Sequence, residues 1–493
     1  MDIIKINPAD NVAVLLEPVS AGTVLEVAGM SIKAACDIPL GHKIALADIT
    51  EGERIIKYGY PIGAATADIR VGEWVHTHNT KTLLDDTADY TYSPEPVPVP
   101  QRESRTFKGF RRSDGSVGIR NELWIIPTVG CVNGTGSIIA RQAESFIDGS
   151  VSGVYCFGHP YGCSQLSDDH VNTQKALAGL VHHPNAGGVL VLALGCENNT
   201  AEQFKEILGD YDPRRVKFLV TQDCGDEIAE GVEIMRELAD YAKGFNREDV
   251  PMSELIVGLK CGGSDGLSGI TANPLVGVFS DKLIGEGGSS ILTEVPEMFG
   301  AETILMNRCI NREIFDKTVA LIQGFKDYFV SYGQTVYENP SPGNKDGGIT
   351  TLEDKSLGCT QKGGGAPVSD VLDYGEPVRT RGLNLLRSPG NDLVASTALA
   401  ASGAHIVLFT TGRGTPFGSP VPTVKISSNS DLARRKPDWI DFNAGVLVTG
   451  SSMETVADDF YEYMRSLASG EILTKTEHYG IREIAIFKDG VTL

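Results

Sequence analysis

The most reactive side chains of this sequence stand directly after apolar runs. Five cysteines do so, at intervals of 32, 33, 28 and 37 residues: Cys131, Cys163, Cys196, Cys224 and Cys261. Each interval is close to the length of one strand–helix–strand unit. In open α/β sheets ligands bind outside the carboxyl ends of the strands, so these thiols are expected to converge on one crevice. The alternative is a set of independent cysteines that pack as small apolar residues.

Thiolates and imidazoles are ligands for soft divalent metals such as Fe(II). The predicted metal ligands are three of these cysteines and two N-terminal histidines: Cys131, Cys163, Cys196, His76 and His78. The histidines occur at i and i+2 in VHTHN (75–79), and in a strand both would point to one face. Because Mn(II) prefers oxygen ligands, three carboxylates remain alternatives: Glu197, Asp265 and Glu294.

Other segments supply polar groups for a substrate. The glycines of CGGSDGLSG (261–269) let backbone N–H groups approach an anion, and Arg413, between two glycines, is suited to gripping a carboxylate. The predicted substrate-binding residues are Gly262, Gly263, Ser264, Asp265, Asn344 and Arg413. The predicted catalytic residues are His159, Lys345 and Arg413. His159 is the candidate acid–base, since an imidazole titrates near neutral pH.

The elements that position these residues follow from the hydrophobic pattern. Residues 1–93 mix apolar and polar residues between closely spaced Gly and Pro, which predicts a small all-β domain. The proline-rich residues 94–104 predict an extended linker. From 105 onward apolar runs alternate with helix-like segments, which predicts an α/β catalytic region with largely parallel sheets, in two parts, 105–250 and 251–493. A strand is expected within 439–448, and the Gly-rich stretch 338–367 is expected to be a functional loop or lid.

Composition excludes several classes of protein. The net charge of −21 argues against a nucleic-acid partner, because phosphate binding needs a basic surface. No apolar run reaches the length of a membrane helix, and the N-terminus lacks a signal-peptide pattern, so a cytoplasmic location is expected. Nine cysteines without a secretion signal do not predict a disulfide framework. No pattern fixes the oligomeric state, so a homo-oligomer remains open.

The motifs taken together resemble the altronate/galactarate dehydratase family. They run in order along the chain: GHKIALADI, EWVHTHNT, RNELWIIPTVGCVN, YGCSQLSDDH, GCENN, CGGSDGLSGITANP, TEVPEMFGAE, NPSPGNKDGGITTLEDKSLGCTQK and TTGRGTPFG. The resemblance implies an N-terminal SAF-type β-clip domain and dehydration of a sugar acid with Fe(II) or Mn(II). EWVHTHNT resembles the altronate branch, which implies conversion of D-altronate to 2-dehydro-3-deoxy-D-gluconate in hexuronate catabolism.

The expected chemistry is elimination of water across C2 and C3. A divalent metal would act as a Lewis acid on the substrate, a base would remove the C2 proton, and an acid would protonate the departing C3 hydroxyl. Three alternatives remain. They are a dehydratase of another aldonate or aldarate such as galactarate, an iron–sulfur hydro-lyase whose cluster uses three or four of the cysteines, and a non-catalytic sugar-acid binding protein.

Overall fold

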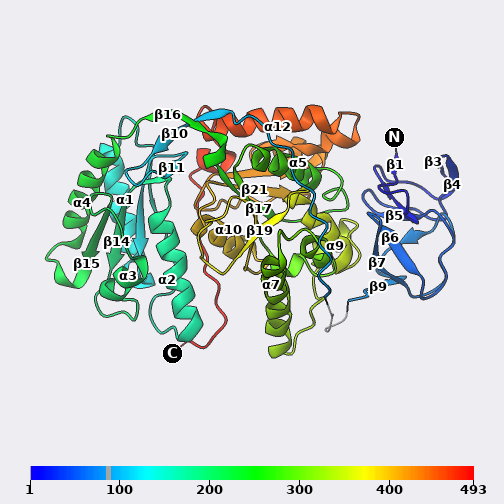
Figure 1. Ribbon diagram of the computed structural model, residues 1–493, viewed down its shortest axis with the longest axis horizontal. Helices are drawn as coiled ribbons and strands as arrows, with labels where there is room; N and C mark the ends of the chain where they lie inside the picture. The colour runs from blue at the N-terminus through cyan, green and yellow to red at the C-terminus, as the bar shows by residue number, and fades with distance from the viewer. Residues whose placement is uncertain (1, 85–89, 493) are drawn as a thin grey trace.

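The computed structural model of the chain describes residues 2–84 and 90–492. Figure 1 shows three bodies in a row along the longest axis. The strand-rich N-terminal body lies at one end, a domain built around β12–β15 lies at the other, and the C-terminal domain lies between them. The chain therefore passes from the N-terminal body across the C-terminal domain before it forms the second domain.

The N-terminal body consists of short antiparallel strands. Its strands are β1 (Ile3–Ile4), β2 (Val12–Leu15), β3 (Val24–Val27), β4 (Met30–Lys33), β5 (Lys43–Ala45), β6 (Arg54–Lys57), β7 (Tyr60–Ala65), β8 (Trp74–Val75) and β9 (Thr80–Lys81). They form sheets of order β1-β2-β5-β8, β6-β7-β9 and β3-β4. Glycines with positive φ, such as Gly41 and Gly59, close the tight turns between them.

The second domain has a four-stranded parallel sheet of order β13-β12-β14-β15. Its elements are β10 (Thr106–Arg111), β11 (Val117–Gly118), β12 (Glu122–Pro127), α1 (Asn133–Ala143), β13 (Val154–Cys156), α2 (Ser167–His182), β14 (Ala186–Ala193), α3 (Ala201–Leu208), β15 (Val216–Val220), α4 (Glu227–Ala242) and β16 (Arg247–Pro251). Alternate residues of the fully buried β14 enter two different cores: Leu190 and Leu192 on one face, Val189 and Val191 on the other. This burial on both faces explains its continuous apolar sequence.

The C-terminal domain is built on a seven-stranded parallel sheet of order β19-β20-β18-β17-β21-β22-β23. Its strands are β17 (Ile256–Cys261), β18 (Ser289–Leu292), β19 (Val368–Leu372), β20 (Gly382–Leu386), β21 (Ile406–Thr411), β22 (Thr423–Ser427) and β23 (Phe442–Asn443). Its helices are α5 (Ala272–Gly285), α6 (Glu302–Met306), α7 (Arg312–Ser331), α8 (Pro342–Asp346), α9 (Leu352–Cys359), α10 (Asp392–Ala401), α11 (Ser430–Arg435), α12 (Met453–Ala468) and α13 (Lys475–His478).

The second and C-terminal domains share one apolar core. Trp124 and Val191 of the second domain belong to the same buried cluster as Leu399 and Val407 of the C-terminal domain. Helices α2 and α10 pack directly on each other, and Gly179 is needed there because a Cβ would lie 2.2 Å from the Ala401 carbonyl oxygen. The carboxyl ends of both parallel sheets are thereby held in a fixed relation.

The predicted fold class, a small all-β domain followed by an α/β region with largely parallel sheets, is confirmed. Two local predictions are wrong. Residues 439–448 form only the two-residue β23 and then a 3₁₀ helix (Ala444–Val448), since the apolar side chains there pack under α12. The stretch 338–367, expected to be a loop or lid, folds into α8, α9 and a 3₁₀ turn (Thr360–Gly363). No helix among the described residues is long and apolar enough to span a membrane.

Candidate active site at the carboxyl ends of the parallel sheets

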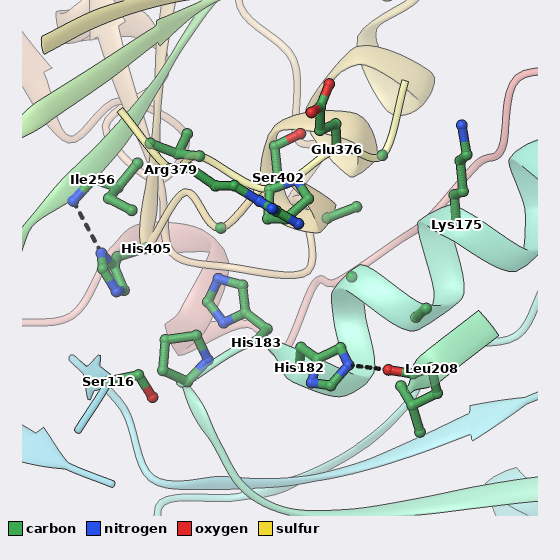
Figure 2. Close-up of a pocket in the computed structure, with 18 of the residues that line it drawn as sticks. Ser116, Lys175, His182, His183, Leu208, Ile256, Glu376, Arg379, Ser402 and His405 are labelled. Atoms are coloured by element: carbon green, nitrogen blue, oxygen red, sulfur yellow. Dashed lines mark hydrogen bonds between the residues drawn. The ribbon is translucent and has the colours of Figure 1, made fainter. Parts of the chain in front are cut away.

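A large pocket of about 820 Å³ lies between the second and C-terminal domains, but at the amino ends of their strands. Figure 2 shows three histidines at this pocket. A ring nitrogen of each histidine is hydrogen-bonded to the main chain. Nε2 of His182 binds the Leu208 carbonyl oxygen (2.8 Å), and Nε2 of His183 binds that of Ala404 (3.1 Å). Nδ1 of His405 accepts from the Ile256 N–H (3.0 Å). These imidazoles therefore hold the domain junction, and the chemistry is sought at the opposite, carboxyl ends of the strands.

Three of the predicted metal ligands lie on neighbouring loops at the carboxyl edge of the four-stranded sheet. Cys131 follows β12, Cys163 follows β13 and Cys196 follows β14, and all three are exposed. Their sulfurs do not all lie within 4.8 Å of one another, because a single set of three potential ligands meets that limit among the described residues, and it is a different one. Cys224 follows β15 on the same sheet, whereas Cys261 ends β17 of the other sheet. The predicted single crevice is thus divided between two sheet edges.

The hydrogen bonds of His159 argue against a role for it as the catalytic acid–base. Its Nε2 donates to the Pro127 carbonyl oxygen (2.8 Å), and its Nδ1 accepts from the Tyr161 N–H (3.2 Å). Burial lowers the pKa of His159, so the ring is neutral and fixes the loop that leads to Cys163. Glu197, an alternative ligand, is likewise used by the main chain, with Oε1 accepting from Leu194 N (3.0 Å).

Within one molecule, His76 and His78 lie far from Cys131, Cys163 and Cys196 and do not share a site with them. The N-terminal body and the second domain lie at opposite ends of the molecule (Figure 1). The two histidines also follow β8 rather than lying within it, so the alternation of a strand does not apply to them. His76 stacks on Trp74 and contacts Thr350 Oγ1 (3.2 Å), and burial lowers its pKa to about 3. His76 therefore stabilises the contact between the N-terminal body and the C-terminal domain.

A buried cluster of charged side chains occupies the carboxyl edge of the seven-stranded sheet. We call it the lysine–glutamate centre, and it comprises Lys260, Glu294, Glu297, Lys355, Lys362, Cys261 and Cys359. Lys260, the second-last residue of β17, binds the carboxylates of Glu294 and Asp392, the latter at 2.9 Å. Lys355, on α9, binds Glu297 Oε1 at 2.7 Å. The centre reaches the surface at Asp392, whose side chain is 37% exposed.

The two glutamates of this centre have opposite properties. Burial would raise the pKa of Glu297, but the ammonium groups of Lys355, Lys260 and Lys362 outweigh it and lower that pKa to about 2. Burial and the neighbouring Glu297 carboxylate instead raise the pKa of Glu294. Glu294 also stands in the left-handed region, at φ 67° and ψ 63°, which is costly for a residue with a side chain and is typical of functional sites. Both oxygens of Glu294 accept hydrogen bonds, one from Lys260 Nζ and the other from Cys261 N (2.6 Å), so Glu294 positions the end of β17.

Glu297 has one oxygen available for chemistry. Its Oε2 is buried and has no hydrogen-bond partner among the described residues, whereas Oε1 is held by Lys355. A buried carboxylate oxygen without a donor is unfavourable unless a ligand or a water satisfies it. The geometry thus leaves an ionised oxygen free beside three ammonium groups.

The same region offers the set of potential metal ligands with the closest spacing. Cys261, Glu297 and Cys359 place their ligand atoms within 4.8 Å of one another. Their distances suit a soft divalent ion, but their surroundings do not, because three buried ammonium groups already favour an anion there. The Cys359 thiol also donates to the Cys261 sulfur (3.4 Å), which lowers the pKa of Cys261 to about 7 and keeps the proton on Cys359. We therefore treat this centre as an anion-binding and proton-transfer site.

Some of the predicted substrate-binding residues lie next to this centre, and others line a separate groove. Gly262, Gly263 and Ser264 continue from Cys261, and the Asn344 amide holds Ser264 O at 2.9 Å. Asp265 is fully engaged by Ser428 (2.8 Å) and Asn429 (3.0 Å), so it shapes the loop rather than offering a free ligand. Arg413 lines a separate surface groove with Asp265 and Gly347, and Lys345 follows Asn344 in α8.

Sequence reasoning missed the lysines and Glu297. Lys260 interrupts the apolar strand IVGLKC at an interior position, which is an unusual place for a charge unless a partner is buried with it. Lys355 and Lys362 lie in LEDKSLGCTQK, within the Gly-rich stretch 338–367 that the sequence pattern predicts to be a loop or lid. TEVPEM holds two glutamates three residues apart, Glu294 and Glu297, and the sequence does not show that Glu297 is buried among lysines.

The fold and the site together define an α/β protein with a buried cluster of lysines and glutamates at the carboxyl ends of a parallel sheet. Three family descriptions match the chain: the Altronate/galactarate dehydratase SAF domain over 1–83, the second domain of D-galactarate dehydratase/Altronate hydrolase over 109–243, and the C-terminal domain of D-galactarate/Altronate dehydratase over 252–492. The chain is 57% identical to an altronate dehydratase of Bacillus subtilis, over 99% of each chain, and 53% identical to that of Escherichia coli, over 100% of each. It is 34% identical to galactarate dehydratase (L-threo-forming) of Escherichia coli, over 98% of this chain and 96% of the relative. The chain belongs to the altronate/galactarate dehydratase family and is a hydro-lyase.

Proposed function

We propose that this protein is a cytoplasmic altronate dehydratase, which converts D-altronate to 2-dehydro-3-deoxy-D-gluconate and water in hexuronate catabolism. The names of the two relatives above 50% identity support the substrate. The observation that carries the chemistry is the buried Glu297 carboxylate, whose Oε2 has no hydrogen-bond partner among the described residues while Lys355 holds Oε1, beside two further buried lysines. That arrangement provides a base, an acid and an anion-binding surface within one centre.

The proposed steps use side chains of this centre. The ammonium groups of Lys355 and Lys362 hold the substrate carboxylate and offset the charge that develops on it when the C2–H bond breaks. The free Oε2 of Glu297 accepts the C2 proton. The C3 hydroxyl takes up a proton from the Lys260 ammonium group and leaves as water as the C2–C3 double bond forms. The enol product then tautomerises to the 2-keto acid, with no net oxidation or reduction.

The proposed entrance lies at the loop 387–392, between β20 and α10. Gly390 is close to Glu297, since a Cβ there would lie 4.0 Å from Oε1, and Asp392 binds Lys260. On its other side the loop lines a pocket of about 180 Å³ together with Asp168 of α2. This pocket is rich in charged and polar groups, as a polyhydroxy acid requires.

The proposed metal is Fe(II) or Mn(II). When bound, such an ion supplies Lewis acidity toward the substrate carboxylate and a hydroxyl oxygen. The lysine–glutamate centre does not fit a cation by charge, so the steps above are assigned to side chains alone.

The test compares buried pairs inside and outside the centre. Glu297→Gln and Lys355→Met are expected to lower kcat for altronate by about 10²- to 10⁴-fold, the range for loss of a positioned acid–base group. Glu302→Gln and Lys326→Met are matched controls, because Lys326 and Glu302 form a buried pair of the same kind at 3.3 Å on α6 and α7. Release of 2-keto acid from altronate and galactarate is measured after reconstitution with each metal. Near-normal turnover by both centre variants, at unchanged Tm, refutes the assignment.

A further inference from the structure

Lys425, in the middle of β22, is a buried cation that the proposed chemistry does not use. It is 0% exposed, and its Nζ donates to the carbonyl oxygens of Thr415 (3.0 Å) and Phe417. Lys425 forms no ion pair among the residues that the structure describes. A buried ammonium group without a carboxylate is unfavourable, and burial lowers the pKa of Lys425 to about 8. An anion close to Lys425 would therefore be stabilising.

The carboxyl groups closest in charge interaction do not neutralise Lys425. Asp441 Oδ2 accepts from the main-chain N–H of Lys425 and Oδ1 from that of Lys475, both at 2.8 Å. Main-chain groups thus hold both oxygens of Asp441, and burial raises its pKa to about 6, so this carboxylate is itself costly to ionise. Asp392 binds Lys260 instead, at 2.9 Å. The charge of Lys425 is left without a partner of its own.

A surface pocket of about 390 Å³ is lined by Lys425 and by residues from the segments that surround β22. Its volume lies in the range of sites for small ligands. Lys475, at the start of α13, lines the same pocket, and its ammonium group has no partner within the described part of the chain. The only acidic residue of the lining is Asp438, which is exposed. Two cations against one carboxylate favour an anionic ligand.

Two aromatic side chains also line this pocket. Trp439 is half-buried and Tyr479 is 60% exposed. The loop after β21 packs closely on Trp439, since a Cβ at Gly414 would lie 3.2 Å from its ring. Trp and Tyr side chains combine an apolar ring face with a polar group at the edge. They suit a ligand that presents both C–H and hydroxyl groups.

The pocket is separate from the lysine–glutamate centre, with which it shares no lining residue. Lys260 pairs with Phe409, and Phe409 pairs with Lys425, on the neighbouring parallel strands β17, β21 and β22. Side chains in register lie on the same face of a sheet. Both ammonium groups accordingly face the Phe409 ring, at 5.5 Å (Lys260) and 5.0 Å (Lys425) from its centroid. The Phe409 ring stands between the two lysines.

We propose that this pocket binds a small sugar acid. The carboxylate of the ligand meets the Lys475 ammonium group above the buried charge of Lys425. Its carbon skeleton lies against Trp439 and Tyr479, and a hydroxyl group donates to Asp438. A hexuronate ring and a linear aldonate share this chemistry. The pocket is a second binding site on the C-terminal domain, and it holds whether or not altronate is the substrate.

Tryptophan fluorescence of the full-length chain tests the site without turnover. D-glucuronate, a ring-form sugar acid, and D-gluconate, a linear one, are titrated separately, with glucose as the uncharged control. We expect a saturable change in emission with at least one of the two acids and none with glucose. Trp439→Phe is expected to lose the change, because Trp74 and Trp124 lie outside the pocket. A response to one acid alone upholds the site and identifies the skeleton that it prefers.

Lysine variants connect the signal to the pocket. Lys475→Met and Lys425→Met are expected to weaken binding about 10- to 100-fold, the range for interactions with a charged group. Lys425→Met removes an unpaired buried charge, so its Tm is expected to be no lower than that of the unchanged chain. Lys475 is half-buried, so Lys475→Met tests the site even where Lys425→Met does not fold. Lys436→Met is the matched control that keeps the affinity, since Lys436 contacts Trp439 (4.3 Å) but does not line the pocket.

Three results would overturn the site. They are an equal response to glucose, an unchanged affinity in Lys475→Met, and a response that persists in Trp439→Phe. Glu297→Gln, in the lysine–glutamate centre, is expected to leave the titration unchanged, and loss of the response in that variant but not in Lys425→Met places the ligand in the centre instead. Failure of this titration leaves the turnover assay of the proposed function untouched, so the two proposals fail separately.

Discussion

Replacing Asp354 with Ala is expected to release the N-terminal domain from the catalytic region. Asp354 binds Lys43 Nζ at 2.8 Å and Lys57 Nζ at 2.9 Å, and the three side chains are 0%, 0% and 2% exposed for Asp354, Lys43 and Lys57. Both lysines come from the N-terminal body, whereas Asp354 lies on α9 of the C-terminal domain. One carboxylate thus neutralises two buried ammonium groups across the interface.

The expected cost follows from what the substitution leaves behind. Removing one partner of a buried ion pair costs about 3–5 kcal/mol, because the remaining charge stays buried. Burial lowers the pKa of Lys43 to about 8 even with Asp354 present, so without the carboxylate Lys43 can lose its proton near neutral pH. Lys57 is then the remaining unpaired charge, and we expect a loss near 4 kcal/mol, which is about 10³ in an equilibrium constant.

Hydrogen exchange measured by mass spectrometry localises the effect. Amides of residues 2–84 are expected to exchange up to about 10³-fold faster in Asp354→Ala, while those of β14 in the second domain are unaffected. Asp48→Ala is the matched control, since Asp48 and Arg70 form an exposed pair in the same domain whose loss costs at most about 1 kcal/mol. The triple change of Lys43 and Lys57 to Met with Asp354→Leu is expected to recover most of the loss. A loss below about 1 kcal/mol for Asp354→Ala, or a triple variant that is equally unstable, would refute the reasoning.

Three further predictions concern activity, acid stability and the loop glycines. Asp392→Asn is expected to raise KM for altronate with little effect on Tm, because it removes the exposed partner of Lys260; unchanged steady-state kinetics would contradict the entrance proposed here. The free energy of unfolding is expected to fall as the pH drops from about 6.5 to about 4. Burial lowers the pKa of His183 to about 3 and that of His405 to about 4, so the unfolded chain binds protons in this range before the folded protein does. Each histidine contributes a loss of about 1.4 kcal/mol per pH unit. Urea unfolding at several pH values checks this, and His405→Gln should flatten the slope. Gly162→Ala is expected to lower Tm by several degrees, because a Cβ there would lie 2.0 Å from the Thr128 carbonyl oxygen at φ +96°. Gly225→Ala, where a Cβ would meet open space and φ is not positive, is expected to leave Tm nearly unchanged in the same thermal unfolding measurement.

Much of the fold could be read from the chain. The continuous apolar run of β14 and its alternation with α3 and α4 predict a parallel sheet covered on both faces, because burial on both faces leaves no polar positions in a strand. The turns of the N-terminal domain are likewise marked by glycines that must adopt positive φ. The family follows from motifs that extend over the whole chain.

The candidate site could be predicted only in part. The regular spacing of Cys131, Cys163 and Cys196 indicates one sheet edge, because successive parallel strands end on the same side. Spacing could not show that Cys261 belongs to a second sheet, since strand order depends on long-range pairing. Nor could it show that both ring nitrogens of His159 are bound by main-chain groups.

The order of strands and helices, the positions that require glycine and the family can all be predicted from the amino-acid sequence, since they depend on local periodicity, backbone conformation and contiguous motifs. Which charged groups meet depends instead on how the folded chain brings distant elements together. Lys260, Glu297 and Lys355 lie on three separate elements, and their pKa values depend on burial and on partners distant in sequence. Charge interactions act through space, so the proton-transfer centre became visible only once the chain was folded.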